Sequence, residues 1–293
     1  MLYRVRHTTT YAYSNSVSVC HNALHLTPRE CRHQRCSYHE LLIYPEPAVI
    51  SHTIDYFGNP MTFFALHEPH DALTMTANST VEVIPVAYPD PQATPPWEQV
   101  RDYLHQDRSG AGLEAYQYVF DSPYVPISEM VLAYAEPVFW SQRPILEAVC
   151  DLTRQIYGEF RYDPEATTIS TPVDEVLRDR HGVCQDFAHL EIACLRVLGL
   201  AARYVSGYLV TNPPADQSLL TGALASHAWL SVFCPGYGWI DVDPTNNMLP
   251  SDAHITVAYG RDYGDVSPIK GVFIGGGAHT LDVAVDVMPI HTS

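Results

Sequence analysis

Prolines are concentrated in one short stretch that divides the chain into two parts of different character. Residues 85–96 read PVAYPDPQATPP, with five prolines in twelve positions. Because proline lacks a backbone N–H and fixes its φ angle, neither an α-helix nor a central β-strand is expected to pass through such a segment. We therefore expect a linker here, with one domain over 1–90 and a second domain over 97–293.

The part before the linker is dominated by alternating apolar and polar residues. Short runs such as HELLIYP and STVEVIPV are separated by turn residues such as FGNP at 57–60. This period of two is typical of half-buried strands. The pattern predicts an antiparallel β-sandwich for the N-terminal domain.

The part after the linker has longer, helix-like periods. ISEMVLAYAEPVFW and RPILEAVCDLTRQIYGEF are spaced for helices, so we expect a helical lead-in over 97–160, followed by a core over 161–250. Alternation returns in HITVAY and HTLDVAVDVMPI, which predicts a C-terminal β-hairpin within 254–290. The chain as a whole is predicted to be α+β.

Acidic residues outnumber basic ones, 33 to 16, and give a formal net charge of −17. Such a field repels phosphate backbones and anionic lipids, so we expect no nucleic-acid partner and no membrane partner. The start, MLYRVRHTTT, has no apolar stretch of the kind found in signal peptides, and a cytoplasmic location is expected. The odd number of scattered cysteines, seven, then indicates free thiols rather than a disulfide framework.

One cysteine lies where a predicted helix begins. In HGVCQDFAHLEIACLRVLG, apolar residues recur at steps of three and four after Gly182, which places Cys194 on the buried stripe and Cys184 in the first turn. Unpaired backbone N–H groups and the positive end of the helix dipole favour a thiolate there. Cys184 is therefore a candidate nucleophile, with simple burial as the alternative.

A histidine and a carboxylate lie on a predicted hairpin within SHAWLSVFCPGYGWIDVDPTNN. A cysteine enzyme needs a nucleophile, a base and a group that holds the base. With a three-residue loop at 234–236, His227 would stand opposite Asp243 on one face of the hairpin. A four-residue loop at 235–238 would turn the two side chains to opposite faces unless a bulge intervened, so we predict a three-residue loop or a bulge.

Three motifs, GVCQDFA, HAW and GWIDVDPT, resemble the core motifs of the transglutaminase-like superfamily of papain-type cysteine enzymes. LHLTPRE, DYFGNP and VEVIPV resemble the β-rich N-terminal domain of its bacterial members. The resemblance implies a papain-like core in which Cys184 is the nucleophile and His227 the base. It implies that Asp243, rather than Asp241, orients that base.

The chemistry that this resemblance implies is attack of a thiolate on an amide carbonyl. The resulting thioester passes its acyl group to water or to an amine. We therefore expect a peptide or protein substrate and, first, a cysteine peptidase or amidase. A transglutaminase and a non-catalytic peptide- or protein-binding module are the alternatives, and neither a metal nor an organic cofactor is implied.

Three further residues are candidates for the oxyanion hole or the cleft. The backbone N–H of Cys184 is a natural first oxyanion donor. Eukaryotic transglutaminases use a tryptophan before the cysteine, but none lies between Trp140 and Cys184, so Tyr162 is a candidate substitute, with a core or strand role as the alternative. Asp186 is the second candidate, although it could serve only to stabilise the helix N-terminus. Trp229 is the third, and it could either line the cleft or only pack under the hairpin.

A zinc site is the rival chemistry in the N-terminal part. CRHQRCSYH offers Cys31, His33, Cys36 and His39, whose side chains suit zinc. Their spacing matches none of the common zinc pairings, and alternate residues of a strand point to opposite faces. We therefore predict no metal site.

Overall fold

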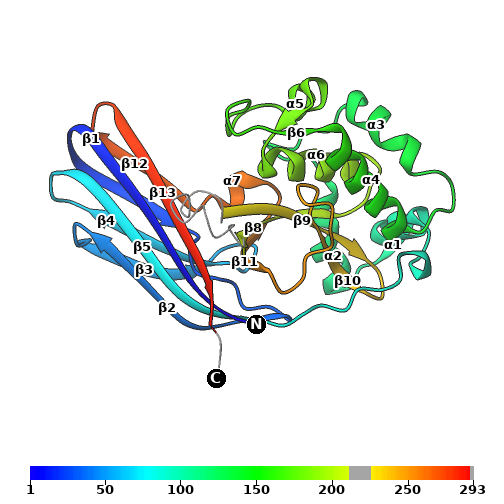
Figure 1. Ribbon diagram of the computed structural model, residues 1–293, viewed down its shortest axis with the longest axis horizontal. Coiled ribbons are helices and arrows are strands. Elements are labelled where there is room, and N and C mark those ends of the chain that lie inside the picture. The colour runs from blue at the N-terminus through cyan, green and yellow to red at the C-terminus, as the bar shows by residue number, and fades with distance from the viewer. Residues whose placement is uncertain (211–225, 291–293) are drawn as a thin grey trace, which may run out of the picture.

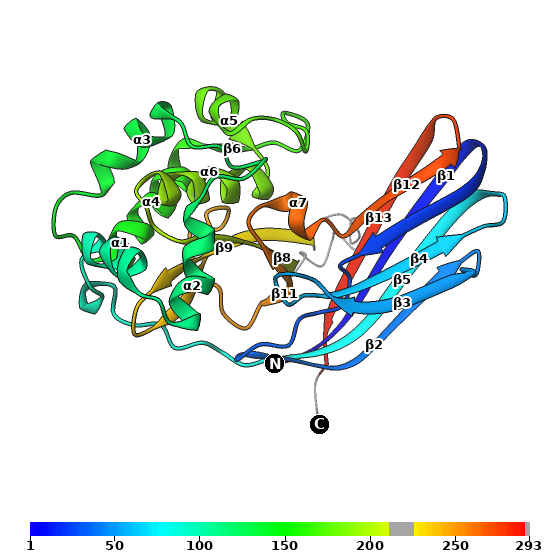
Figure 2. The same cartoon turned by 180° about the vertical axis from the view of Figure 1, so that it is seen from behind.

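The computed structural model describes residues 1–210 and 226–290, which form two units lying side by side (Figure 1). One is a large antiparallel sheet, and the other is a smaller sheet surrounded by helices; Figure 2 shows the same division from behind. The predicted α+β class is confirmed. None of the helices in the described residues has the length and apolar character of a membrane span.

The large sheet is built around one long strand. Its N-terminal strands are β1 (Leu2–Leu24), β2 (Gln34–Tyr44), β3 (Val49–Ile54), β4 (Pro60–Leu66) and β5 (His70–Val83), in the order β2-β5-β1-β4-β3. The first half of β1 pairs with β5 and the second half with β4. Apolar side chains from both halves share one core cluster that includes Leu24, Phe64 and Met75. The predicted antiparallel β architecture is present as one hydrogen-bonded sheet, through which β1 runs and whose halves share a core.

The C-terminal hairpin completes this large sheet and does not belong to the smaller, helical unit. β12 (Ile269–Gly275) and β13 (His279–Pro289) both pair with β1. Of the predicted 254–290 segment, only β11 (His254–Gly260) joins the smaller sheet. The assignment of 97–293 to one domain is therefore wrong for these two strands. Alternation identifies a strand, but tertiary contacts decide which edge it pairs with.

The second unit is a four-stranded antiparallel sheet with helices around it. The strands, in the order β10-β9-β8-β11, include β8 (Ala202–Leu209), β9 (Ser226–Cys234) and β10 (Gly238–Val242). Its helices are α1 (Trp97–Gln106), α2 (Gly110–Tyr116), α3 (Glu129–Ala135), α4 (Ile145–Glu159), α5 (Val173–Asp179), α6 (Cys184–Val197) and α7 (Tyr263–Val266). A short parallel pair, β6 (Arg161–Tyr162) and β7 (His181–Gly182), leads into α6.

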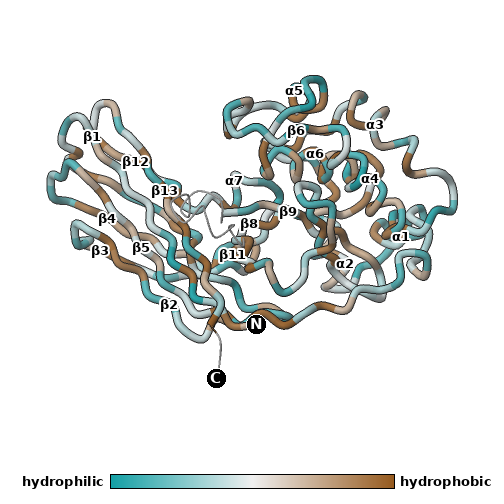
Figure 3. The backbone as a smooth tube through the Cα atoms, in the orientation of Figure 1, coloured by the Kyte–Doolittle hydropathy of each residue, from teal (hydrophilic) through white to brown (hydrophobic). Residues whose placement is uncertain are grey.

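Helix α6 is the centre of this unit. It packs on β8 and β9, and α3, α4 and α5 pack around it, so that most of its side chains are buried. Figure 3 shows apolar stretches of chain gathered in the interior of this unit. A buried helix has one well-defined place against its sheet, and α6 therefore fixes the position of its first residue, Cys184.

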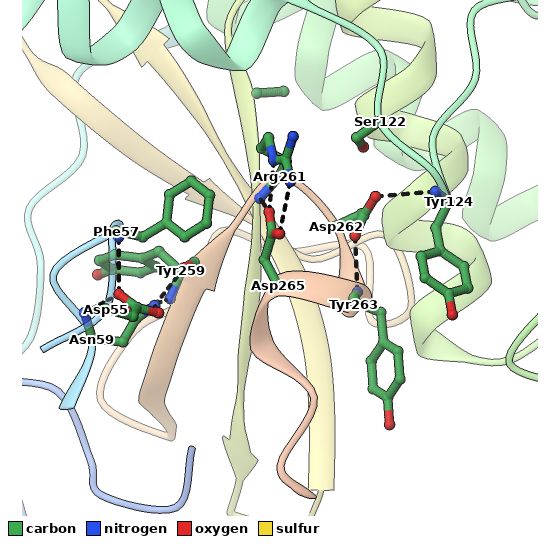
Figure 4. A network of polar contacts seen from close by, with 12 residues as sticks. Asp55, Phe57, Asn59, Ser122, Tyr124, Tyr259, Arg261, Asp262, Tyr263 and Asp265 are labelled. Carbon is green, nitrogen blue, oxygen red and sulfur yellow. Dashed lines mark hydrogen bonds and ion pairs between the residues drawn. The ribbon is translucent and has the colours of Figure 1, made fainter. Parts of the chain in front are cut away.

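Two buried side-chain amides join the large sheet to the free edge of β11. Gln34 Nε2 donates to the Thr256 carbonyl (2.7 Å) and Gln34 Oε1 accepts from the Thr256 N–H (2.8 Å). Asn59 makes the same pair of bonds with the Tyr259 carbonyl (2.7 Å) and N–H (2.8 Å), as Figure 4 shows in part. Each amide replaces one rung of a β-ladder, so the backbone of this edge strand is satisfied by the other unit.

Candidate active site

Cys184 is placed by a carboxylate cap at the start of α6. Asp186 Oδ2 accepts hydrogen bonds from the Val183 N–H (2.8 Å) and from Thr167 Oγ1 (2.6 Å). A Cβ at position 182 would lie 2.8 Å from that carboxylate oxygen, so only glycine leaves room for the cap. Asp186 does not line the cleft, and its place in the structure is that of a positioning residue for the helix start.

The hairpin of β9 and β10 brings His227 and Asp243 together. Its loop spans 235–237, which is three residues as predicted but one residue later than the 234–236 loop. Moving the loop by one residue shifts the partner of each β10 residue by two positions along β9. Because side chains alternate between faces, Asp243 stays on the same face as His227. His227 Nε2 lies 2.8 Å from Asp243 Oδ2, which leaves Nδ1 of the imidazole for Cys184.

Cys184 and His227 line the same pocket, and the electrostatics of the site favour a protonated imidazole. Burial alone would lower the pKa of His227. Hydrogen bonds to Asp243 and Cys184, together with the negative charges of both partners, outweigh burial and raise the pKa of His227 to about 10. An imidazolium next to a cysteine sulfur stabilises the thiolate, which is the nucleophilic form.

Asp243 is held by more partners than the sequence indicated. The side chain is fully buried, and Oδ2 also accepts from His254 Nε2 (3.0 Å) and Asn246 Nδ2 (2.7 Å), while Oδ1 accepts from the Thr245 N–H (2.9 Å). Burial opposes ionisation, but the hydrogen bonds from His227, His254 and Asn246 keep the pKa of Asp243 well below its usual value. The carboxylate is therefore ionised and fixed in orientation.

Two of these partners, Asn246 and His254, were not predicted from the sequence. Asn246 follows the GWIDVDPT motif directly, so its closeness to the site could have been inferred. His254 opens the strand pattern HITVAY, where nothing in the spacing distinguishes a ligand of a carboxylate from any other strand residue. The pairing of β11 with β8 is what carries His254 to Asp243.

His227, Asp243 and His254 also offer three metal-ligand atoms within 4.8 Å of one another. A cation there would have to displace the proton that His227 shares with Asp243. Hydrogen bonds from the two imidazoles to the carboxylate already explain why these three atoms lie close together, and we assign the contacts to hydrogen bonding. In the N-terminal segment, Cys31 Sγ lies 3.7 Å from His33 Nε2, whereas His39 bonds to Thr27 and Ser79.

Trp229 lies beneath the histidine rather than in the cleft. It is fully buried, with ring centroids 5.9 Å from His227 and 5.1 Å from His254. Its Nε1 donates to Asp241 Oδ2 (3.2 Å), so the second aspartate of the motif holds the tryptophan and not the imidazole. The indole thereby excludes water from one side of the pair formed by His227 and Asp243, which strengthens their interaction.

Tyr162 does line the cleft, on the side of Cys184. The side chain is half exposed, and burial and the nearby charge of Cys184 raise the pKa of its hydroxyl, which stays protonated and able to donate. Tyr204 of β8 lines the cleft as well, and its hydroxyl has a pKa raised well above the usual value, first by burial. Two neutral phenols thus stand near the candidate nucleophile.

The cleft itself lies between the two units and has a volume of about 380 Å³. The helical unit contributes Cys184, His227 and tyrosines, and the large sheet contributes residues of β1, β12 and β13. The N-terminal and C-terminal strands are therefore a wall of the candidate active site. The sequence alone left the role of the N-terminal domain open, between restricting substrate access and binding a partner.

Family models match both units. The model of the bacterial transglutaminase-like N-terminal region matches residues 3–82, and the model of the transglutaminase-like superfamily matches residues 133–244. The second match contains Cys184, His227 and Asp243.

Three relatives show how far the sequence similarity extends. An uncharacterized protein of Mycobacterium tuberculosis (strain H37Rv) is 43% identical over 298 residues, covering 98% of this chain and 92% of the relative. An uncharacterized protein of Mycobacterium leprae is 33% identical and covers 97% of both chains. A protein-glutamine gamma-glutamyltransferase of Pseudomonas aeruginosa is 32% identical over 126 residues, which are 36% of this chain and 19% of that protein.

A solved structure shares the whole fold. The crystal structure of a "Putative Cysteine Protease" from Cytophaga hutchinsonii superposes with a TM-score of 0.78, covering all of this chain and 92% of that one, at 22% sequence identity. The likeness includes the large sheet as well as the helical unit. The chain therefore belongs to the transglutaminase-like superfamily, with a bacterial transglutaminase-like N-terminal region preceding its core.

Proposed function

We propose that this protein is a cysteine peptidase or amidase that acts on peptide or side-chain amides through Cys184, His227 and Asp243. The observation that carries the proposal is the protonated, doubly anchored imidazole of His227 beside a cysteine at a helix N-terminus. Members of the family are typically enzymes with this set of side chains. An ordinary buried cysteine has no such partner.

The geometry supports the following sequence of steps. The Cys184 thiolate attacks the carbonyl carbon, and the electron pair of the carbonyl moves to oxygen, where the Cys184 N–H and the Tyr162 hydroxyl donate to it. His227 gives its Nδ1 proton to the leaving nitrogen as the C–N bond breaks, and a thioester remains. His227 then takes a proton from water, which attacks the thioester and releases the acid and the thiolate. Asp243 keeps the ring in place throughout.

Transamidation is the second candidate, and it shares the thioester. It is favoured by the similarity of the core to a relative named protein-glutamine gamma-glutamyltransferase. In that case an amine attacks the thioester instead of water. Product masses measured with and without an added primary amine would separate the two reactions.

The first test is selective alkylation of the nucleophile. Limiting iodoacetamide is added between pH 5 and 8, and the modified cysteine is identified by mass spectrometry in the wild type, His227→Ala and the control His39→Ala, which changes a histidine of the large sheet. We expect rapid, selective modification of Cys184 at low pH in the wild type and the control, and its loss in His227→Ala. Equal, slow labelling of several cysteines in all three proteins would contradict the proposal and favour a non-catalytic binding module.

A further inference from the structure

Alternate residues of β1 and β13 face the candidate nucleophile across the cleft. The cleft is lined by His7, Thr9 and Tyr11 of β1 and by Leu281 and Val283 of β13. In the ladder between the two strands, Tyr11 pairs with Leu281 and Thr9 with Val283. These side chains therefore share one face of a two-stranded ribbon, and this face is directed at the site of Cys184.

The ribbon is polar at its deep end. His7 is buried, with Nδ1 3.0 Å from the Tyr208 hydroxyl and Nε2 3.1 Å from Thr9 Oγ1. Burial lowers the pKa of His7 to about 4, so its ring is neutral. Tyr208 belongs to β8, which pairs directly with the strand that carries His227. Nδ1 of His7 thus joins the ribbon to β8, and the contact of Nε2 with Thr9 of the same strand orients the ring.

The ribbon is apolar at its outer end. The Leu281 side chain is 54% exposed and that of Val283 is 38% exposed, although both lie beside a reactive site. The packing of the protein leaves these two side chains half free, and their exposed surface borders the cleft. A substrate that covers them removes apolar surface from water, which favours binding.

The residues that line the cleft also restrict the charge of the ligand that it can bind. Among the described residues that line it there is no aspartate, glutamate, lysine or arginine, and five of the side chains are tyrosines. Apart from His227 and Cys184, which pair with each other, the described lining offers a charged substrate group no partner of opposite charge to offset its lost hydration. Neutral groups do not suffer this loss.

We propose that the face of β1 and β13 is the specificity wall of the enzyme, and that it selects acyl donors whose group next to the reacting carbonyl is neutral and apolar. The inference rests on the proposed function, because it assigns a substrate class to the same site. Leu281 and Val283 supply the apolar contact. The N-terminal and C-terminal strands then contribute to substrate selection as well as to the fold.

The test uses alkylating probes, so that no natural substrate is needed. N-butyl iodoacetamide is compared with analogues of the same length that end in a carboxylate or an ammonium group, each normalised to its rate with free cysteine. We expect Cys184 to react with the butyl probe about tenfold faster than with either charged probe. The overall net charge of −17 would favour the ammonium probe, so slow reaction of both charged probes distinguishes the wall from a long-range field.

Three variants locate the selectivity. Leu281→Gln and Val283→Thr change exposed side chains on the cleft face, and Asp282→Asn changes the opposite face of the same strand. We expect the first two to reduce the preference for the butyl probe, relative to plain iodoacetamide, at least about threefold. The Asp282→Asn variant should keep the wild-type preference.

The outcomes separate this inference from the proposed function. If Cys184 reacts selectively with iodoacetamide but reacts at the same rate with all three probes, the proposed specificity wall is contradicted and the proposed thiol chemistry is not. The same conclusion follows if Asp282→Asn changes the preference as much as Val283→Thr does. If Cys184 shows no selective reaction with iodoacetamide itself, the proposed function fails and the wall fails with it.

Discussion

At the scale of single residues, the site depends on how one carboxylate is held. Asp243 accepts from two imidazoles, a side-chain amide and the backbone. Cys184, His227 and Asp243 could be predicted because their motifs resemble those of the superfamily, and that resemblance chose Asp243 over Asp241. His254 could not be predicted, because its contact with Asp243 arises from the pairing of two strands and not from any local pattern.

His254 is expected to act as a positioning residue for Asp243. His254→Leu removes a donor from a fully buried carboxylate, so His227 should be less well oriented, and the alkylation rate of Cys184 at pH 6 should fall about tenfold. His254→Gln keeps a donor near the position of Nε2 and should restore most of the rate. Circular dichroism verifies that both variants are folded. Equal rates in His254→Leu and the wild type would show that the contact has no part in the site.

Glu191 is expected to make the protein less stable as the pH rises. It is fully buried in α6, where it accepts from Thr153 Oγ1 (2.8 Å), and burial raises the pKa of its carboxyl to about 8. The folded state favours the protonated carboxyl of Glu191. Its contribution to the free energy of unfolding is therefore fully present below the unfolded pKa of about 4.3, and it is lost as the pH rises towards 8. The loss should be on the order of 5 kcal/mol.

Urea unfolding of the wild type and of Glu191→Gln measures this contribution. The variant cannot ionise, so its stability relative to the wild type should increase between pH 4.5 and 8 and then level off. Glu175→Gln, an exposed change in α5, is the control and should show no such trend. A constant difference across that pH range would mean that Glu191 is already ionised in the folded protein.

At the scale of elements, local pattern predicted strands and helices better than it predicted their partners. Helix α6 follows from its apolar period, and the three-residue loop of the β9–β10 hairpin follows from the need to keep His227 and Asp243 on one face. The pairing of β12 and β13 with β1 could not be predicted. β1 lies at the opposite end of the sequence, and no local pattern connects it with them. The hydrogen bonds that the side-chain amides of Gln34 and Asn59 make with β11 could not be predicted from the sequence either.

Asn59→Ala is expected to weaken the joint between the two units. The change leaves the buried N–H and carbonyl of Tyr259 without the bonds that the amide provides, which should lower the free energy of unfolding by about 2–4 kcal/mol. Asn78→Ala, in β5 of the same sheet, is the control and should have a much smaller effect. Urea titrations compare the three proteins. An equally small loss in Asn59→Ala would mean that water replaces the amide at the edge of β11.

At the scale of the whole molecule, the two ends of the chain meet. All of β13 pairs with the first half of β1 (Figure 1). The face that the two strands share is a wall of the cleft that Cys184 and His227 line. The large sheet needs the C-terminal strands, and these strands follow the catalytic unit in the chain. The large sheet is therefore not a contiguous piece of sequence, and the stabilities of the two units should be linked.

We accordingly expect the two units to unfold in one transition. Buried cysteines report on each of them, Cys20 in the large sheet and Cys194 and Cys234 in the catalytic unit, and all are free thiols. Pulsed alkylation at increasing urea, read by mass spectrometry, should expose the three at one midpoint, which tryptophan fluorescence should share because all four tryptophans lie between 97 and 239. Exposure of Cys20 at lower urea would show that the large sheet opens alone. The cleft would then lose its second wall while α6 and the β9–β10 hairpin still held Cys184 beside His227.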